Sequence, residues 1–313
     1  MILKKFQLYT LTRHWALKNS TNRFFSTVNT KDWKLGFLGT GRIAQAIILG
    51  LIDQNKVKPE QIFVSDANLE YLKYLRERCP KFQSLNINYI ESNLEILKYA
   101  RTILLCVKPK DIPGLLNQVS SCVSKEHLII SLAAGIQIKN IEKHLPRESR
   151  VVRIMPNLAA LVQQSVSLYA RGSNATKEDG QVVKKLLESV GYCEDEINED
   201  LMNVVTALSG SGPAYMCVVL DALAEGAVKM GMSRQLALSL ATRTMAGSAN
   251  MLINELNKEG QGKHVMSIKE EISSPGGTTI HGLSELERFN IRHAFAKCVE
   301  MATNRAKELN RMN

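Results

Sequence analysis

Short apolar runs alternate with longer amphipathic stretches between residues 34 and about 196 of this 313-residue chain. The runs have the length of β-strands, and the stretches between them carry apolar residues at helical spacing. The strand-like runs are Lys34–Leu38, Ile62–Ser65, Thr102–Val107, Leu128–Leu132 and Val151–Met155, with Asn86–Ile90, Ser165–Tyr169 and Tyr192–Glu196 as further strands. This alternation predicts βαβ units and a mostly parallel sheet.

After about Asn198 the strand pattern stops. Apolar residues then recur at helical spacing in Asp200–Leu208, Pro213–Met230, Arg234–Leu256 and His293–Leu309. Sequence that is only helical, following a βαβ array, indicates a second domain. We therefore expect an α/β domain over residues 32–197 and an all-α domain over residues 198–313.

Residues 1–31 have a different composition from the rest of the chain. They contain six basic and no acidic residues, with many Ser and Thr and with spaced large apolar residues. This is typical of a mitochondrial transit peptide, so we expect a mitochondrial protein of the matrix, cleaved between Arg23 and Asp32. A disordered basic tail is the alternative.

The charge and composition of the remaining chain limit the kinds of partner and ligand that we expect for this protein. Without residues 1–31 the net charge falls from +10 to +4, and basic residues do not cluster with aromatic ones, so we expect no nucleic-acid partner. No apolar run reaches the roughly 18 residues that cross a bilayer, so we expect no membrane span. The six cysteines and six histidines are scattered, which predicts reduced thiols and no metal site.

A glycine motif stands between the first strand and the helix after it. Gly39 permits a tight turn, Gly41 allows the backbone to approach a pyrophosphate, and Ala44 allows close packing of the helix on the sheet. The free N–H groups of the helix N-terminus favour the phosphate charge. With a strand before it and a helix after it, the motif predicts a Rossmann-type dinucleotide site, although a plain glycine turn can imitate it.

Asp66 ends the second strand, 25 residues after Gly41. An acidic residue there can hold the ribose 2′-hydroxyl of NADH, whereas NADPH carries a phosphate at that place. No Arg or Lys follows before Lys73, which favours NADH, but a cation from another loop would admit NADPH. A turn-forming aspartate is the alternative.

Several other segments lie where an open α/β sheet binds ligands, beyond the carboxyl ends of its strands. Val107-Lys108-Pro109 and Ala133-Ala134-Gly135 end the next two long strands, and Lys108 either contacts phosphate or faces solvent. Asn157 after the following strand is better explained as a local turn.

Two glycine-rich segments open helices in the second half. Ser209–Tyr215 is a normal helix start with a proline in its first turn. Ser273–Thr279 leaves backbone N–H groups free before a helix, which suits a substrate carboxylate, and a plain capping loop is the alternative.

Taken in order, these segments resemble 1-pyrroline-5-carboxylate reductases, from about Leu35 to Leu309. Four elements carry the resemblance: Gly39–Ala44, Cys106–Pro109, Ser209–Tyr215 and Ser273–Thr279, with Asp221–Gly226 following the third at its usual distance. The resemblance implies a Rossmann-type dinucleotide-binding domain followed by an all-α dimerisation and substrate domain. It also implies hydride transfer from NADPH or NADH to the imine carbon of pyrroline-5-carboxylate, which gives L-proline.

The resemblance assigns site residues by position. The pyrophosphate would be held by Leu38, Gly39, Thr40, Gly41, Arg42 and Ile43, with Asp66 and Asn93 near the adenosine ribose. The nicotinamide side would be lined by Cys106, Val107, Lys108, Pro109, Leu132, Ala133, Ala134 and Gly135. The substrate carboxylate would be bound by Ser274, Gly276, Gly277, Thr278 and Thr279, of which Thr279 would also serve as the catalytic hydroxyl at the imine nitrogen.

The resemblance further implies a homodimer formed by interleaved C-terminal helices, often assembled further into decamers, with each active site completed at the subunit boundary. Three stretches depart from the family pattern: Leu158-Ala159, Gln163–Ser167 and Glu255–Ile268. In the last, Glu255 and Glu259 are the candidates for a carboxylate contact that the family usually supplies from this region.

The departures leave a second hypothesis open, a catalytically weakened relative that binds dinucleotide and acts as a sensor or assembly partner. A third hypothesis is a β-hydroxyacid dehydrogenase relative with the same domain order. That class places a lysine on a helix after the nucleotide domain, and here the Pro213–Met230 helix offers only Lys229, late in the helix.

Overall fold

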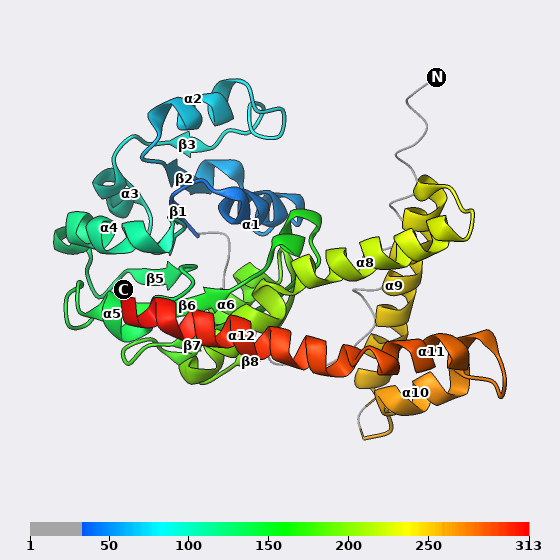
Figure 1. The fold of residues 1–313 in the computed structure, drawn as a ribbon. Helices are drawn as coiled ribbons and strands as arrows, with labels where there is room; N and C mark the ends of the chain where they lie inside the picture. The colour runs from blue at the N-terminus through cyan, green and yellow to red at the C-terminus, as the bar shows by residue number, and fades with distance from the viewer. Residues whose placement is uncertain (1–32, 259, 313) are drawn as a thin grey trace.

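The computed structural model describes residues 33–258 and 260–312 (Figure 1). The expected transit peptide, residues 1–31, lies outside the described residues. Eight strands form one sheet in the order β3-β2-β1-β4-β5-β6-β7-β8. The strands are β1 (Leu35–Leu38), β2 (Ile62–Ser65), β3 (Asn88–Tyr89), β4 (Thr102–Leu105), β5 (Leu128–Ser131), β6 (Arg150–Met155), β7 (Ser165–Arg171) and β8 (Gly191–Glu196).

The sheet is mostly parallel, as the alternation predicts. Only β7 runs antiparallel to its neighbour β6, and β8 then pairs parallel with β7. Every residue of β1, β2 and β5 is buried, because helices cover both faces of the sheet. This explains why these strands read as continuous apolar runs, and it confirms the predicted strands with small changes at their ends.

Two apolar cores lie on the two faces of the sheet. One contains residues of α1 (Arg42–Asp53), α2 (Leu69–Glu77) and α6 (Lys177–Leu187), and the other contains residues of α3 (Asn93–Tyr99), α4 (Ile112–Val119) and α5 (Ile138–Glu142). Short 3-10 turns connect the elements at Pro59–Gln61, Pro109–Asp111, Ser120–Cys122, Leu158–Val162 and Glu199–Leu201. The result is a three-layered α/β domain whose strands β1, β4 and β5 end side by side.

Beyond β8 the described residues are helical. The helices are α7 (Met202–Val205), α8 (Gly212–Lys229), α9 (Arg234–Leu256), α10 (Val265–Ile272), α11 (Thr278–Arg288) and α12 (Ile291–Met312). The helix expected over Asp200–Leu208 is present, but its backbone changes from the 3-10 turn Glu199–Leu201 through α7 to a π-helical turn at Thr206–Gly210, where the Ser211 N–H donates to the Thr206 carbonyl. The two-turn helix α10 was not predicted.

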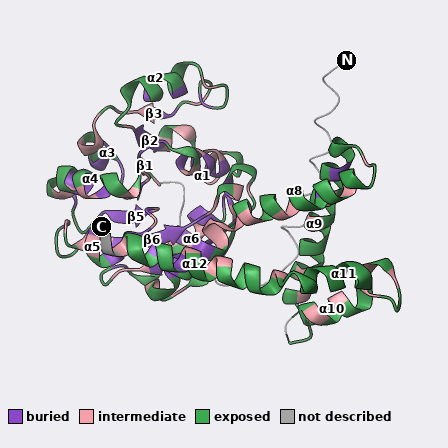
Figure 2. Cartoon of the chain, viewed as in Figure 1, coloured by how far each residue is buried: buried purple, intermediate pink, exposed green. Residues whose placement is uncertain are grey.

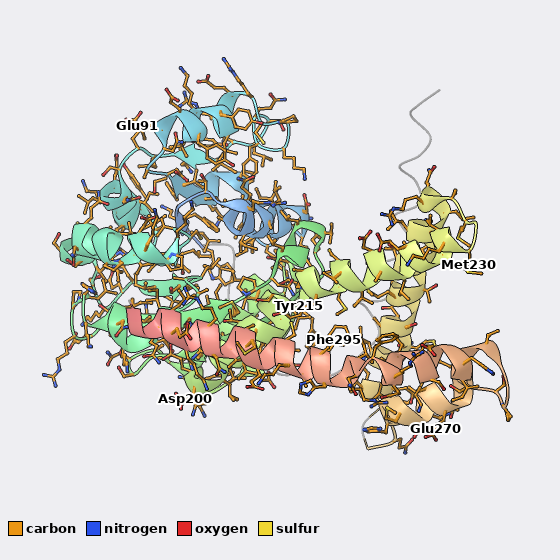
Figure 3. All side chains as sticks on the ribbon, viewed as in Figure 1. Glu91, Asp200, Tyr215, Met230, Glu270 and Phe295 are labelled. Atoms are coloured by element: carbon orange, nitrogen blue, oxygen red, sulfur yellow. The ribbon has the colours of Figure 1, made fainter. Side chains whose placement is uncertain are left out.

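Helices α8 to α12 form an arm that extends away from the sheet, and α12 returns along it to end beside α5 (Figure 1). Most of the arm is exposed in the single chain (Figure 2). Each of the two long helices buries one residue, Ala224 in α8 and Ala237 in α9. Large apolar side chains remain in water, such as Met230 at the far end of α8 with 87% of its surface exposed (Figure 3).

The helical stretch Glu199–Lys229 is long and apolar enough to cross a membrane by length and composition, with a mean hydropathy of 1.3 in its most apolar window. The stretch reaches this threshold by its average hydropathy and contains no uninterrupted apolar run of about 18 residues. One such helix does not by itself indicate a membrane protein, and the expectation of no membrane span stays a prediction. Only 11% of that window is buried within the chain, so its apolar surface needs a cover that this chain alone does not supply.

One ion pair ties the sheet to the start of the arm. Arg153 of β6 is 1% exposed, and its Nη1 donates to Glu199 Oε1 at 3.0 Å. The same oxygen accepts from the Ile138 N–H of α5 at 2.8 Å. Burial lowers the pKa of Arg153, and Glu199 opposes that shift by stabilising the charge. Helix α5, strand β6 and the 3-10 turn Glu199–Leu201 are thus joined at one carboxylate.

Removing the charge of Glu199 should cost more than removing that of Arg153. Glu199→Gln keeps an acceptor for the Ile138 N–H but leaves a buried guanidinium without a counter-charge, so we expect a loss of about 3 kcal/mol in the free energy of unfolding. In Arg153→Met the remaining carboxylate is reached by water, since the Glu199 side chain is 24% exposed, and the loss should be smaller.

The double variant Arg153→Met/Glu199→Gln should recover to within about 1 kcal/mol of the parent. The measurement is the urea midpoint of all four proteins. Equal losses in both single variants, with no recovery in the double variant, would contradict a role of the pair's charges.

Candidate active site

The turn after β1 is shaped by the end of β4. Gly39 has a φ of +100°, and a Cβ placed there would lie 2.9 Å from the backbone carbon and oxygen of Cys106. Both the backbone conformation and the space therefore require glycine. The Gly39 N–H donates to the Ser65 carbonyl at 2.8 Å, so the turn is held between β2 and β4.

Gly41 has a different explanation from Gly39. A Cβ at Gly41 would meet only the Cys106 carbonyl oxygen, at an ordinary 3.8 Å. The protein itself therefore tolerates a side chain there, and the glycine suits a ligand that comes close to the backbone. Gly41 is the N-cap of α1 and provides no side-chain cap, so the first N–H groups of a 12-residue helix remain available to a phosphate.

The carboxylate of Asp66 braces the glycine turn. Its Oδ2 accepts from the N–H of Thr40 at 2.9 Å and from the Thr40 hydroxyl at 2.7 Å, and its Oδ1 accepts from the Asn68 N–H at 3.0 Å. A carboxylate has about four acceptor positions, so one remains for a ribose hydroxyl. Both interpretations of Asp66, turn former and ribose partner, fit the same geometry.

Asn93, the other predicted ribose residue, begins α3 and lies in a polar chain. Its Oδ1 accepts from the Ser65 hydroxyl at 2.6 Å, and its Nδ2 donates to Gln118 Oε1 at 2.9 Å. Ser65 is the last residue of β2, next to Asp66. The structure therefore brings Asp66 and Asn93 to the same strand end, as predicted.

A cavity of about 320 Å³ opens beside the glycine turn. Six of its lining residues were predicted as cofactor contacts: Gly41, Arg42, Ile43, Cys106, Val107 and Leu132. Three were not assigned to the cofactor, namely Ala44, Met155 and Pro156. Met155 and Pro156 lie at the end of β6, beside β5, so the strand order was the signal that could have found them.

The other predicted cofactor residues surround the cavity without lining it. Leu38, Thr40 and Ala133 are buried, so a cofactor would reach only their backbone. Lys108 is exposed and Pro109 begins a 3-10 turn, which leaves the role of Lys108 in phosphate binding a prediction. Ala134 and Gly135 continue the loop after β5, and Gly135 packs against the last turns of α12, where a Cβ would lie 3.1 Å from that of Leu309.

The cavity has little ionisable character. Its titratable lining residues are Arg42 and Cys106, and burial raises the pKa of the Cys106 thiol, so this cysteine stays neutral at physiological pH. Apart from the Arg42 guanidinium, whose charge suits a phosphate, the walls are neutral and largely apolar and suit a flat uncharged ring. A bound nicotinamide cofactor would supply the hydride itself. The residues present thus fit a dinucleotide, with the phosphates at α1 and the ring near Cys106 and Leu132.

Asn157 connects the cavity to the arm. Its Nδ2 donates to the carbonyl of Ser209 at 3.2 Å and to the Ser209 hydroxyl at 3.3 Å, and its Oδ1 accepts from the Ala159 N–H. The local turn predicted for Asn157 is therefore present, and the same side chain also ties β6 to the π-helical turn before α8. Ser209–Tyr215 is a helix start, as expected, and it lies at this junction.

Two departures from the family pattern have a structural account. Gln163 adopts φ 56° and ψ 35°, a left-handed conformation that costs a non-glycine residue about 1 kcal/mol, where the family usually carries a glycine-containing stretch. Glu255 accepts from the Lys258 ammonium at 2.6 Å and from the Lys263 N–H at 3.0 Å. The Glu255 carboxylate therefore stabilises the loop between α9 and α10. Glu259 lies outside the described residues.

The predicted substrate loop begins α11. Gly276 has a φ of +67°, and Gly277 is the N-cap of this 11-residue helix without a side-chain cap. A Cβ at Gly277 would lie 2.4 Å from the Ser274 hydroxyl oxygen, so the loop folds back on itself. The N–H groups of Thr278 and Thr279 begin the helix, and Ser274 and Gly276 are exposed beside them. This arrangement can hold a carboxylate.

The substrate loop and the cofactor cavity lie at opposite ends of the single chain. The loop follows α10, which Glu270 marks at the far end of the arm, while Tyr215 marks where α8 leaves the nucleotide domain (Figure 3). No residue of Ser273–Thr279 lines the cavity. Within one chain the structure thus brings the cofactor residues together but leaves the substrate residues apart from them.

Comparisons with known proteins agree with this division. Residues 199–309 match a family described as pyrroline-5-carboxylate reductase dimerisation, and residues 34–135 match one described as NADP oxidoreductase, coenzyme F420-dependent. The chain is 40% identical over 281 residues to pyrroline-5-carboxylate reductase 3 of Rattus norvegicus, covering 89% of this chain and 96% of the relative. It is 37% identical over 283 residues to pyrroline-5-carboxylate reductase 2 of Homo sapiens, covering 89% and 84%.

A solved structure has the same fold. The pyrroline carboxylate reductase of Plasmodium falciparum with NADP bound aligns with a TM-score of 0.77 at 29% identity, covering 90% of this chain and 100% of that one. Fold and site define a two-domain NAD(P)H-dependent oxidoreductase with a dimerisation domain. At this level of identity and coverage, the chain belongs to the pyrroline-5-carboxylate reductase family.

Asp66 should set the preference between the two nicotinamide cofactors. Asp66→Asn keeps an acceptor for the turn but removes the negative charge that faces a 2′-phosphate. We expect the ratio of kcat/KM for NADPH to that for NADH to rise about tenfold. Asp53→Asn, at the exposed end of α1, is the matched control and should leave the ratio unchanged. An unchanged ratio in Asp66→Asn would show that Asp66 only braces the turn.

Proposed function

We propose that this chain reduces 1-pyrroline-5-carboxylate to L-proline in active sites that two subunits build together. The family membership supports the reaction and the use of NAD(P)H. The observation that supports the shared site is the separation, within one chain, of the cavity predicted for the cofactor from the loop predicted for the substrate carboxylate. Two chains related by a twofold axis place the loop of each against the cavity of the other.

The exposed arm supports the same dimer. Helices α8 and α9 leave apolar residues in water along most of their length, for example Val218 at 71% and Leu256 at 84% exposure. A second arm that interleaves with the first covers these faces and gains the hydrophobic free energy that the single chain lacks. Decamers built from such dimers are the larger assembly that we propose from the family resemblance.

The protein's own residues have three roles in the reaction. The N–H groups at the start of α11 bind the substrate carboxylate and fix the ring in position. The Thr279 hydroxyl donates a hydrogen bond to the imine nitrogen, and general acid assistance makes the imine carbon a better hydride acceptor. The neutral walls near Cys106 and Leu132 orient the nicotinamide and exclude water.

Purified protein beginning near Thr30 should oxidise NADH or NADPH only in the presence of pyrroline-5-carboxylate, followed by the loss of absorbance of the reduced cofactor. Thr279→Ala should lower kcat about 100-fold, while Thr279→Ser, which keeps the hydroxyl, should retain most activity. Ser284→Ala on the exposed face of α11 is the control and should be unaffected. A folded protein that binds cofactor but turns over with neither would support the weakened relative instead.

Mixed dimers test whether the site is shared. Gly41→Ala should fold, since its Cβ meets only one atom at 3.8 Å, but should block the pyrophosphate. Co-expression of Gly41→Ala with Thr279→Ala places one intact loop against one intact cavity in each mixed dimer. We expect about a quarter of the parent activity from random pairing. No recovery, with mixed dimers demonstrated by differential tags, would mean that each chain builds its own site.

The location is proposed from the composition of residues 1–31 alone. A basic, acid-free and hydroxyl-rich segment supports import into the mitochondrial matrix. The full chain expressed in eukaryotic cells should co-purify with mitochondria and carry a new N-terminus between Arg23 and Asp32, read by mass spectrometry. A cytosolic protein that retains Met1 would refute this proposal.

A further inference from the structure

The larger of the two cavities described measures about 570 Å³. Residues of α5, of α7 and of the end of α12 contribute to its lining. Its charged lining residues are Lys139 and Lys143 from α5 and its final turn, and Lys307 from α12. The amide side chains of Gln137, Asn140, Asn203 and Asn310 complete the polar wall. No residue of the cofactor cavity lines it.

All three lysines are exposed, but three features set them apart from other exposed lysines. Lys139 and Lys143 are four residues apart on one helical face, and Lys307 approaches the same space from a helix distant in the sequence. Among the described residues that line the cavity there is no carboxylate. Within the part of the chain that the structure describes, none of the three lysines forms an ion pair. Three like charges facing one concave space repel one another until an anion enters.

Three acidic residues that belong to or adjoin the elements lining this cavity have other partners. Glu199 accepts from Arg153 and from the Ile138 N–H, and Glu142 accepts from the N–H and hydroxyl of Ser173. Glu308, next to Lys307 in the sequence, accepts from Arg305 on the other side of α12. Among the residues that the structure describes, no carboxylate pairs with these lysines, and the amide side chains offer further donors to phosphate oxygens.

We infer that this cavity is a binding site for a small molecule that carries two or more phosphate groups, separate from the dinucleotide site. Such a ligand spans α5 and α12 and neutralises the three ammonium groups at once. Lysine suits it as a compact point charge with three donors. The cavity volume is that of a small-metabolite site.

The site also has a route to the active site. Asn310 donates to Asn203 Oδ1 at 3.0 Å, and its own Oδ1 is buried about 3.5 Å from the Cβ position of Gly135. Gly135 belongs to the loop after β5 that was predicted to line the nicotinamide. A ligand that holds α12 against α5 therefore also holds the support of this loop, and the consequence is regulation of cofactor binding.

Inorganic triphosphate is the probe, measured by calorimetry on the purified full chain with saturating NAD to occupy the glycine turn. We expect one triphosphate per chain and an affinity that falls as salt rises. The variant Lys139→Gln/Lys143→Gln/Lys307→Gln should raise the Kd at least about tenfold. The variant Lys81→Gln/Lys125→Gln/Lys177→Gln changes net charge equally at exposed positions outside the cavity and should bind like the parent.

Hydrogen exchange provides a second readout. Triphosphate should slow exchange in residues 133–140 and in the last turns of α12 in the parent and the control variant but not in the cavity variant. Absence of binding with NAD present, or equal weakening in both triple variants, would overturn the inference. Neither result would affect the reductase proposal, because the turnover assay contains no triphosphate.

Discussion

The structure depends on one constraint: the apolar faces of the arm cannot remain in water. Helices of 18 and 23 residues with a single buried residue each have no core of their own. The nucleotide domain shows the contrast, since its strands are buried on both faces and its two cores are continuous. In the proposed dimer, a second chain covers the arm, and the same pairing brings the predicted carboxylate loop to the predicted cofactor cavity. Stability and catalysis would then depend on the same contact between two chains.

At the cofactor cavity, the positions of the backbone and of neutral side chains matter more for the chemistry than ionisable groups do. Gly39 is fixed by the backbone of Cys106, Asp66 braces Thr40, and burial keeps Cys106 neutral. The one hydroxyl assigned to the reaction, that of Thr279, comes from the arm. This arrangement would place cofactor binding in the nucleotide domain and the choice of substrate in the arm.

The sequence predicted the sheet well because strands buried on both faces read as uninterrupted apolar runs. It also placed Gly39, Asp66 and Cys106 at one edge, since parallel strands share their carboxyl ends. It missed α10, because eight residues give too short a periodic signal. It could not find the pairing of Arg153 with Glu199, which are 46 residues apart, nor the cavity lysines, because only tertiary packing brings such positions together. The assigned roles of Thr279 and Lys108 stay predictions.

The close approach of Leu309 to Gly135 bears on how the protein is handled at the bench. The last turns of α12 pack against the loop after β5, which is predicted to line the nicotinamide side of the cofactor. An affinity tag or fluorescent fusion joined at Asn313 would start four residues after Leu309, close to this contact. A tag placed ahead of Asp32 avoids this contact, and it is the arrangement under which kinetic constants describe the enzyme and not its fusion.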